Sequence, residues 1–382
     1  MRKLWAGLLA STLLLSQQLP VGQIIDEVAA ASDPEQRYAL YLPAAYTPER
    51  AWPVVLAFDP GGRGRRAVEQ YQAAAEKSGY IIAASNVSRN GSWAVSMGAA
   101  QAMGDDVSRR FSIDKKRVYT AGMSGGARVA MGVALGSSNV VAGVVASSAG
   151  YPDSQPRKSA PFAVFGTAGT DDFNWLEMKQ LDHALTSPHH VAIFEGGHVW
   201  LSSKLAVEAL EWLDVEAMRT GRLARDEVRL DSILQERLAQ AQALTEEGAR
   251  CLALEALATS FAGLRDVSAL SAEAAGLRRG KSVREWLKKE QAEEQQEQRR
   301  IDAILSLERG LNTAEERTEA LAQLTDEWKN MASAAAAAQD SAERRVARRV
   351  SRGLAMGAPG RTKDAGYLKL MERYRPARTS AR

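Results

Sequence analysis

The sequence contains little cysteine and little histidine, and both shortages limit the chemistry open to it. Cys251 is the only cysteine among 382 residues, which excludes an internal disulfide and a zinc site built from cysteines. Its neighbours, "ARCLALEAL", are typical of a helix, in which we expect the thiol to be buried as a small apolar group. A reaction that needs a histidine base has only four candidates.

A strong net charge and long apolar runs are missing as well. The formal net charge of +3 is too small to predict binding to nucleic acid. Beyond the N-terminus, no run is long and apolar enough to predict a transmembrane helix. The hydrophobic fraction of 45% is ordinary for a globular protein, and the length is sufficient for two domains.

Residues 1–22 have the layout of a secretory signal peptide. Arg2 and Lys3 form a positive start, and the apolar, uncharged stretch 4–15 follows. This stretch is too short to span a bilayer well, which disfavours a transmembrane helix. A clean small-residue cleavage site, which a signal peptide would have, does not follow at the usual distance. We therefore expect a secreted or periplasmic protein, the alternative being a short N-terminal helix.

Two regions of different texture follow. In residues 30–214, short apolar runs alternate with glycine-rich turns and amphipathic stretches, which predicts a mostly parallel sheet with helices on both faces. The expected strands are 37–43, 52–60, 79–86, 116–122, 140–150, 160–169 and 189–198. In residues 225–376, Glu, Arg, Gln, Ala and Leu dominate, which predicts an all-α domain.

Three stretches of this helical region allow more detailed predictions. Residues 231–264 are similar to a tetratricopeptide-type helical pair with a turn at Glu247-Gly248, but no second copy follows at a fixed period. Residues 285–300 are so highly charged that a solvated helix is expected. Residues 333–350 form a helix with a basic end, for which solvation is favoured over contact with acidic lipid or nucleic acid.

The stretch Gly122-Met123-Ser124-Gly125-Gly126 fits the pattern G-x-S-x-G. An expected strand runs into it and an expected helix, 127–135, leaves it, as a nucleophile elbow requires. Small neighbours allow the sharp turn, and the backbone N–H groups at the N-terminus of the helix can stabilise an oxyanion. We predict Ser124 as a nucleophile, the alternative being a turn without chemistry.

A serine nucleophile needs a base, and position along the chain separates the four histidines. His183 lies within a helix, and His189 and His190 precede a strand, at the wrong end of a parallel sheet. His198 follows "VAIFEGG" at the carboxyl end of the last expected strand, where catalytic groups of such sheets gather. We therefore predict His198 as the base.

The acid that orients this histidine should lie between Ser124 and His198 in the chain. Asp171 and Asp172 both follow the strand 160–169, in the loop where the acid is expected. Asp172, which begins the run Asp-Phe-Asn, is the first choice, and Asp171 is the second. Asp153, after the preceding strand, is a third option. A calcium site at the paired aspartates is the competing reading, but no further ligands are spaced for it, and no metal is expected.

The loop "FDPGGRG" opens into glycines at the end of another strand. The N–H groups of Gly61 and Gly62 are candidates for the second oxyanion donor, whereas Pro60 has no N–H. The loop 85–93 also follows a strand, and its position suggests three residues for substrate binding: Asn86, Asn90 and Trp93.

Taken together, "AGMSGGAR", "FGTAGTDDFN" and "GGHVW" resemble the α/β-hydrolase superfamily. Within it, the chain looks most like secreted esterases of the polyhydroxybutyrate-depolymerase, feruloyl-esterase and dienelactone-hydrolase type, over about residues 35–213. The resemblance implies an α/β-hydrolase fold followed by an all-α domain, and a triad of Ser124, Asp172 and His198 with Gly125 as oxyanion donor. Many relatives carry His-Gly where this chain has Asp59-Pro60.

The resemblance also implies a reaction. We expect a serine hydrolase that cleaves a small-molecule or polymeric carboxylic ester through an acyl-enzyme, without a cofactor. The helical domain has no such counterpart, and a protein partner is one expected role for it. The alternatives are a prolyl-oligopeptidase-like peptidase, which would lack the large propeller domain of those enzymes, and a non-catalytic binding protein that works through its helical domain.

Overall fold

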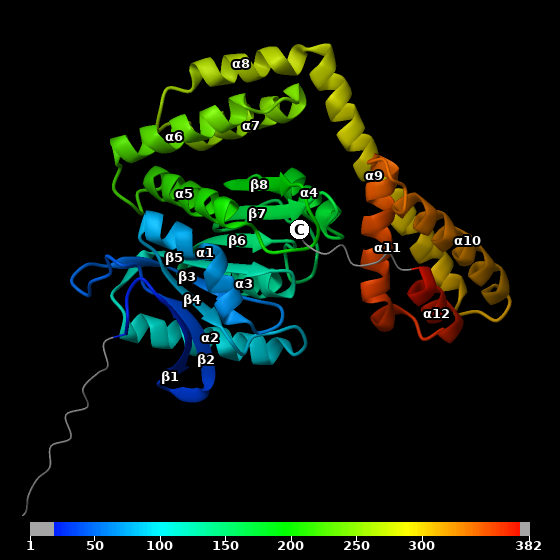
Figure 1. The fold of residues 1–382 in the computed structure, drawn as a ribbon, viewed down its shortest axis with the longest axis horizontal. Helices are drawn as coiled ribbons and strands as arrows, with labels where there is room; N and C mark the ends of the chain where they lie inside the picture. Colours follow the sequence, from blue (N-terminus) through cyan, green and yellow to red (C-terminus); the bar gives the residue numbers. More distant parts are fainter. Residues whose placement is uncertain (1–18, 375–382) are drawn as a thin grey trace, which may run out of the picture.

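An eight-stranded sheet forms the centre of the first part of the chain (Figure 1). The computed structural model describes residues 19–374, so most of the predicted signal peptide, 1–22, lies outside the described residues. The strands are β1 (Ile24–Ala30), β2 (Asp33–Tyr41), β3 (Trp52–Phe58), β4 (Ile81–Ser85), β5 (Ile113–Met123), β6 (Val141–Ser147), β7 (Ala163–Gly169) and β8 (His189–Phe194).

The strand order is β1-β2-β4-β3-β5-β6-β7-β8. Strand β2 is antiparallel to β1 and β4, and the other neighbouring strands are parallel. Strands β3 and β6 are apolar and buried along their whole length, as expected for parallel strands covered on both faces. Strand β1 was not predicted, and it starts before the predicted domain boundary at residue 30. Its central Asp26 and Glu27 are exposed and hide the strand pattern.

Helices cover both faces of the sheet. On one face α1 (Gly64–Ser78) and α5 (Ser203–Arg219) pack on the core that contains Tyr71, Phe165 and Leu210. On the other face α2 (Trp93–Arg110) and α3 (Gly125–Gly136) pack on the core that contains Phe58 and Met131. Helix α4 (Trp175–Ala184) lies between β7 and β8 in the chain and contacts both strands. Strand order and helix placement are those of the α/β-hydrolase fold, which confirms the predicted fold class.

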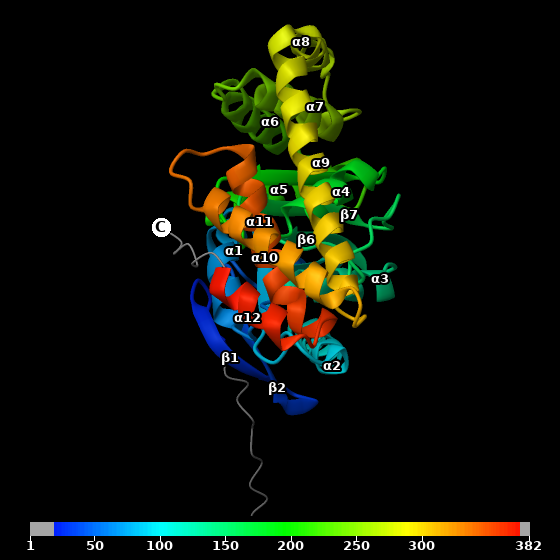
Figure 2. The same cartoon turned by 90° about the vertical axis from the view of Figure 1, so that its right-hand side faces the viewer.

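The remaining helices form the predicted all-α part, in two groups joined by one long helix (Figures 1 and 2). Helices α6 (Glu227–Gln242), α7 (Glu247–Phe261) and α8 (Ser268–Arg279) lie on the α5 side of the sheet domain. The break between α6 and α7 falls just before the predicted turn. Helix α9 (Lys281–Gly310) then leads to α10 (Arg317–Ala335), α11 (Ala342–Arg361) and α12 (Ala365–Tyr374).

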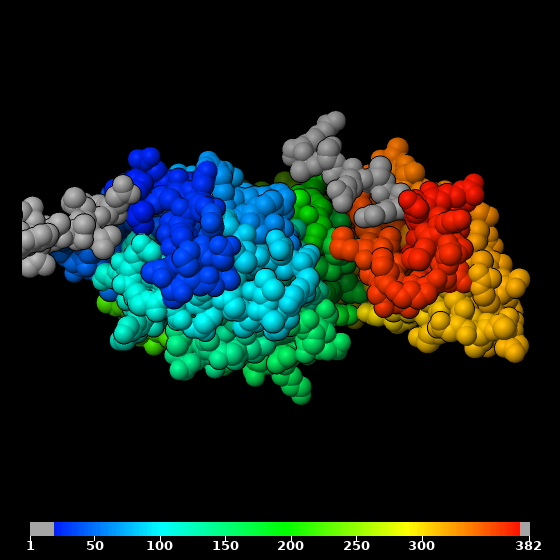
Figure 3. All heavy atoms as spheres, turned by 90° about the horizontal axis from the view of Figure 1, so that it is seen from below, coloured from blue at the N-terminus to red at the C-terminus, as the bar shows by residue number. Residues whose placement is uncertain are grey.

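Helices α9–α12 have a hydrophobic core of their own around the fully buried Trp328. Seen from below in space-filling form, this orange and red lobe lies beside the sheet domain (Figure 3). Among residues 19–374, no helix combines the length and the apolar character needed to cross a membrane.

Two predictions for these helices were wrong in part. Helix α9 was expected to be solvated, but Glu293 and Glu297 on it are buried. The basic end of the stretch 333–350 was also expected to be solvated, yet Arg349 is fully buried, and it forms ion pairs with both glutamates. The charges of one helix neutralise those of the other, so burial of either set depends on a partner more than 50 residues away in the chain.

Candidate active site

Ser124 occupies a strained turn between β5 and α3. Its backbone angles, φ 55° and ψ −123°, are unfavourable for any residue other than glycine. A Cβ atom on Gly122 would lie 2.1 Å from the carbonyl oxygen of Gly126, and one on Gly126 would lie 1.9 Å from that of Phe58. The flanking glycines are therefore needed for the close approach of strand, helix and the end of β3.

The predicted serine, histidine and aspartate form one hydrogen-bonded chain. The Oγ atom of Ser124 lies 2.8 Å from Nε2 of His198, and Nδ1 of His198 lies 2.7 Å from Oδ1 of Asp172. The three residues follow the carboxyl ends of β5, β8 and β7. Because the carboxylate of Asp172 accepts a hydrogen bond from the Nδ1–H of His198, Nε2 is left to accept the hydroxyl proton of Ser124. This arrangement can activate the serine as a nucleophile.

The geometry separates the three aspartates that the sequence offered as the acid. Asp172 is fully buried behind His198. Asp171 forms an ion pair with Arg348 at 2.8 Å, and Asp153 forms one with Arg157 at 3.0 Å. Asp171 and Asp172 thus have different partners, which disagrees with the alternative of a shared calcium site. Among the described residues, no group of three or more His, Cys, Asp or Glu side chains is placed to hold a metal ion.

The loop that carries the acid is tied to the loop that carries the histidine. The N–H of Thr170 donates to the carbonyl of Phe194 at 2.8 Å, and the N–H of Asp171 donates to that of Gly196 at 2.7 Å. The ring of Phe173 stacks on His198 with a centroid distance of 3.9 Å. Sequence reasoning gave Phe173 no role; its place directly after the predicted acid was the available signal.

Gly125, the predicted oxyanion donor, directly follows Ser124 in the chain. It is the first residue of α3, and the N–H groups of a first helical turn have no partner within the helix. The carboxamide of Asn90 lies directly against it, because a Cβ atom on Gly125 would be 1.8 Å from Oδ1 of Asn90. A predicted substrate-binding residue and the predicted oxyanion donor are therefore adjacent.

The prediction of Gly61 and Gly62 as second oxyanion donors needs correction. The N–H of Gly61 donates to the carboxylate of Asp59 at 2.8 Å, and that of Gly62 donates to the carbonyl of Asp59 at 3.1 Å. Both groups are engaged within their own loop, so neither is open to a substrate oxygen in this structure.

Asp59 is fully buried but well provided with donors. Its carboxylate accepts hydrogen bonds from Nε of Arg63 and from Nε1 of Trp200, both at 2.9 Å. Burial alone would raise its pKa, but the hydrogen bonds from Arg63, Trp200 and Gly61 outweigh burial and lower the pKa. Asp59 is therefore an ionised anchor that joins the loop after β3 to the segment after His198.

Asn86 and Trp93, predicted to bind substrate, have other contacts. The side chain of Asn86 accepts from the N–H of Gly64 at 3.0 Å and donates to the carbonyl of Asp26 at 2.9 Å, so it holds the start of α1 against β1. Trp93 packs on Gly132, whose Cβ would lie 2.5 Å from its ring. Gly132 is about 12 Å along α3 from Ser124, since a helix rises 1.5 Å per residue. The interpretation of these two residues as pocket lining is not supported by these contacts.

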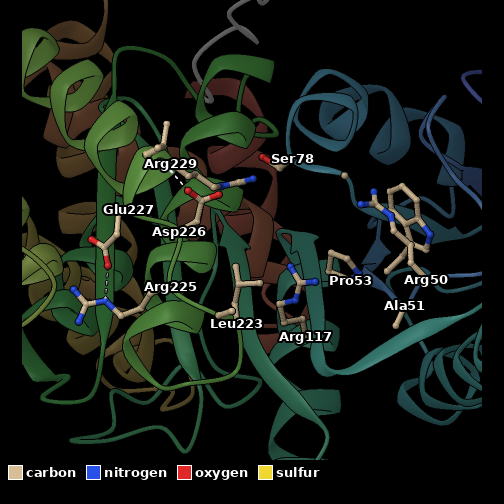
Figure 4. Close-up of a pocket in the computed structure, with 14 residues that line it drawn as sticks. Arg50, Ala51, Pro53, Ser78, Arg117, Leu223, Arg225, Asp226, Glu227 and Arg229 are labelled. Atoms are coloured by element: carbon tan, nitrogen blue, oxygen red, sulfur yellow. Dashed lines mark hydrogen bonds and ion pairs between the residues drawn. The ribbon is translucent and has the colours of Figure 1, made fainter.

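A cavity of about 600 Å³ lies near the amino end of β3, away from the carboxyl strand ends that Ser124 and His198 follow (Figure 4). Pro53 near the start of β3 and Arg117 in the first half of β5 line one side of it, and Arg225 and Arg229 line the other. Because Ser124 and His198 follow the carboxyl ends of their strands, this cavity is not the space in which they would meet a substrate.

No protein-family model and no curated protein matches the chain. Solved structures match about half of it. An esterase from Pyrobaculum calidifontis is 12% identical, with 52% of this chain and 87% of that chain covered and a TM-score of 0.41. A ferulic acid esterase is 16% identical, with 50% of this chain and 97% of that chain covered and a TM-score of 0.40. FphF, a fluorophosphonate-binding serine hydrolase of Staphylococcus aureus, is 13% identical, with 51% of this chain and 99% of that chain covered and a TM-score of 0.41.

Proposed function

We propose that this protein is a serine hydrolase that cleaves a carboxylic ester, of a small molecule or a polymer, through an acyl-enzyme. The observation that carries the proposal is the hydrogen-bonded chain from Ser124 through His198 to the buried Asp172. The strained backbone of Ser124 supports it, because strain of this kind persists at functional sites.

Each of these residues has a role in the proposed reaction. His198 takes the hydroxyl proton through Nε2 while Oγ of Ser124 attacks the ester carbonyl carbon. Asp172 stabilises the imidazolium, and the N–H of Gly125 stabilises the negative carbonyl oxygen of the tetrahedral intermediate. His198 then gives its proton to the leaving alcohol, and the acyl group stays on Ser124. Water then attacks the acyl carbon while His198 takes one of its protons. His198 returns this proton to Oγ of Ser124 as the bond between Oγ and the acyl carbon breaks, which releases the acid and the free serine.

We assign the second oxyanion donor to the side chain of Asn90. Gly61 and Gly62 are engaged by Asp59, whereas Asn90 lies against Gly125. Its carboxamide presents Oδ1 on that side, and rotation of the amide by half a turn exchanges Oδ1 for the donor Nδ2.

Labelling with a fluorophosphonate tests the proposed function. The probe adds covalently to an activated serine, and intact mass counts the adducts. We expect a single adduct on the wild type and none on Ser124→Ala. The matched control is Ser137→Ala, at the other end of α3, which should be labelled like the wild type. A wild type that takes no label, while a known serine hydrolase does so in parallel, would contradict the proposal. A screen of acyl esters then identifies the substrate.

We further propose that the protein is exported. The support is the charged and then apolar pattern of residues 1–22. The mature N-terminus after expression with a secretion system tests this proposal, since removal of about 20 residues is expected for a signal peptide. A full-length chain that stays in the cytoplasm would contradict it.

A further inference from the structure

Helix α11 contacts the loop that carries the triad acid. The guanidinium of Arg349 donates from Nη1 to the carbonyl oxygen of Thr170 at 2.6 Å. Arg348 donates from Nη1 to Oδ2 of Asp171 at 2.8 Å. The two residues that directly precede Asp172 are therefore both held by the helical domain.

The position of Arg349 is itself fixed on several sides. Its side chain is fully buried, and it donates to Glu297 at 2.6 Å and to Glu293 at 2.8 Å, both on α9. Its guanidinium lies 4.1 Å from the ring centre of Trp175, the first residue of α4. A buried charge with hydrogen bonds on each nitrogen tolerates little displacement. Arg349 is thus a rigid link between α9, α11 and the acid loop.

The same face of α11 also contacts the residue that follows Asp172 in the chain. Gly353 is one helical turn beyond Arg349, and a Cβ atom there would lie 3.5 Å from Cβ of Phe173. Phe173 stacks on His198, so contacts with α11 flank Asp172 on both sides in the chain.

The acid depends on its loop for its position. Only Oδ1 of Asp172 has hydrogen-bond partners among the described residues, namely His198 and the N–H of Asn174, and the buried Oδ2 has none. The charge of Asp172 also acts on Glu297 of the helical domain. Burial raises the pKa of Glu297 to about 7, the positive charge of Arg349 opposes this rise, and the negative charge of Asp172 adds to it.

We propose that Arg348 and Arg349 are positioning residues of the hydrolase site, and that helices α9–α12 hold the acid loop in its working geometry. This inference rests on the proposed function. It assigns the helical domain a role within the site: through α11 it fixes the loop of Asp172, and thereby the orientation of His198.

The kinetics of fluorophosphonate labelling of the full chain separate positioning from binding. The concentration dependence of the rate gives KI, for reversible binding of the probe, and kinact, for attack by Ser124. A displacement of about 1 Å in a catalytic group lowers a rate about 100-fold, so we expect kinact of Arg349→Met to fall by about that factor, with KI unchanged. Arg349→Lys keeps the charge but not the planar fork, and should recover part of kinact.

A second pair of variants keeps the test valid if Arg349→Met does not fold. Arg348 and Asp171 are partly exposed, so Arg348→Gln and Asp171→Asn should leave the fold intact. Each breaks the same ion pair and should lower kinact, by about 3- to 10-fold for a partly exposed pair, and the double variant should lose no more than either single one. Arg344→Gln is the control: it lies on α11 but pairs with Asp340 at 3.2 Å within the helical domain.

The outcomes are distinct. A folded Arg349→Met, or Arg348→Gln and Asp171→Asn, with the kinact of the wild type would overturn the positioning role. A change confined to KI would also overturn it, because it indicates a role in probe entry. Absence of label on the wild type contradicts the proposed function itself. Loss of kinact in both Arg348→Gln and Asp171→Asn, with Arg344→Gln unaffected, supports the inference.

Discussion

At the scale of single residues, the position of Ser124 depends on neighbouring residues that have no side chain. Ser124 reaches the turn between β5 and α3 because Gly122 and Gly126 leave room for backbone. The same demand does not apply at Gly136, the last residue of α3, where a Cβ atom would meet no heavy atom of residues 19–374 within 4 Å. Two glycines of one helix therefore differ in their tolerance of a methyl group.

We expect Gly126→Ala to destabilise the protein by about 3 kcal/mol or more, because the added carbon would lie 1.9 Å from the carbonyl oxygen of Phe58 and must force α3 from β3. Gly136→Ala, the control, should leave the stability unchanged or raise it by up to about 1 kcal/mol. Urea unfolding of both variants measures the difference. Equal stability of Gly126→Ala and the wild type would disagree with the close contact.

Replacement of Asn90 tests the assigned second oxyanion donor. Loss of one such donor lowers kcat about 100- to 1000-fold, and we expect this for Asn90→Ala on the ester found by the screen. The side chain of Asn90 is exposed, so stability should stay constant. Asn86→Ala is the contrasting change, because it removes hydrogen bonds to Gly64 and Asp26. We expect it to lower the free energy of unfolding and to leave kcat close to that of the wild type. A normal kcat in Asn90→Ala would return the donor role to the loop of Gly61.

Sequence reasoning placed the serine, acid and histidine in three strand-end loops because strand order along the chain determines which loops meet. It preferred Asp172 to Asp171 by position alone, and the distance to His198 now separates them. It could not place the N–H groups of Gly61 and Gly62, since their direction depends on Asp59, which in turn is held by Trp200, 141 residues later.

At the scale of elements, α4 and α9 meet through a titratable contact. Nε2 of His183 lies 3.0 Å from the carboxylate of Glu294, which Lys179 also approaches at 3.4 Å. The hydrogen bond and the charge of Glu294 raise the pKa of His183, although burial opposes the shift. Burial also acts to raise the pKa of Glu294, but the bonds and charges of His183 and Lys179 lower it.

The contact should therefore stabilise the fold within a pH window. Protonated His183 is favoured in the folded state, so its contribution is complete below its unfolded pKa of about 6.5 and is lost as pH rises through the higher folded value. His183 is more than half exposed, which limits the effect to about 0.2–1 kcal/mol. We expect His183→Gln to lower the free energy of unfolding near pH 6 and to change it little at pH 8.5. A loss of equal size at both pH values would contradict this assignment.

The charged helices show why element-scale prediction failed in part. Helix α9 was identified as a helix, and its glutamates were interpreted as solvated because most highly charged helical faces are. Burial of Glu293 and Glu297 follows from Arg345 and Arg349 on α11, and periodicity within one helix carries no information on a partner from another. The basic end of the stretch 333–350 was misread for the same reason.

At the scale of the whole molecule, the helices have clusters apart from the cores on the two faces of the sheet, although α6 and α7 also share a cluster with Val215 and Met218 of α5. Trp328 is central to the core of α9–α12, whereas Leu254 on α7 belongs to a small cluster of α6, α7 and α8. Both side chains are fully buried, and replacing either with alanine should cost about 2–5 kcal/mol in the core that holds it. The two helical groups differ in what they contact, because α11 reaches the acid loop and α7 packs against α5.

This difference predicts how heating should affect the site. If α9–α12 hold the acid loop, Trp328→Ala should lose fluorophosphonate labelling at the temperature at which these helices melt, below the temperature at which the sheet unfolds. Leu254→Ala should lower the melting temperature of α6–α8 while labelling continues until the sheet unfolds. Circular dichroism follows the loss of helix, and the unfolding step that each variant shifts relative to the wild type identifies the group of helices that melts. Fluorophosphonate pulses at each temperature follow the site. Labelling of Trp328→Ala that outlasts the melting of α9–α12 would show that the sheet domain alone keeps Asp172 in place, and the helical domain would then have to act elsewhere than on the triad.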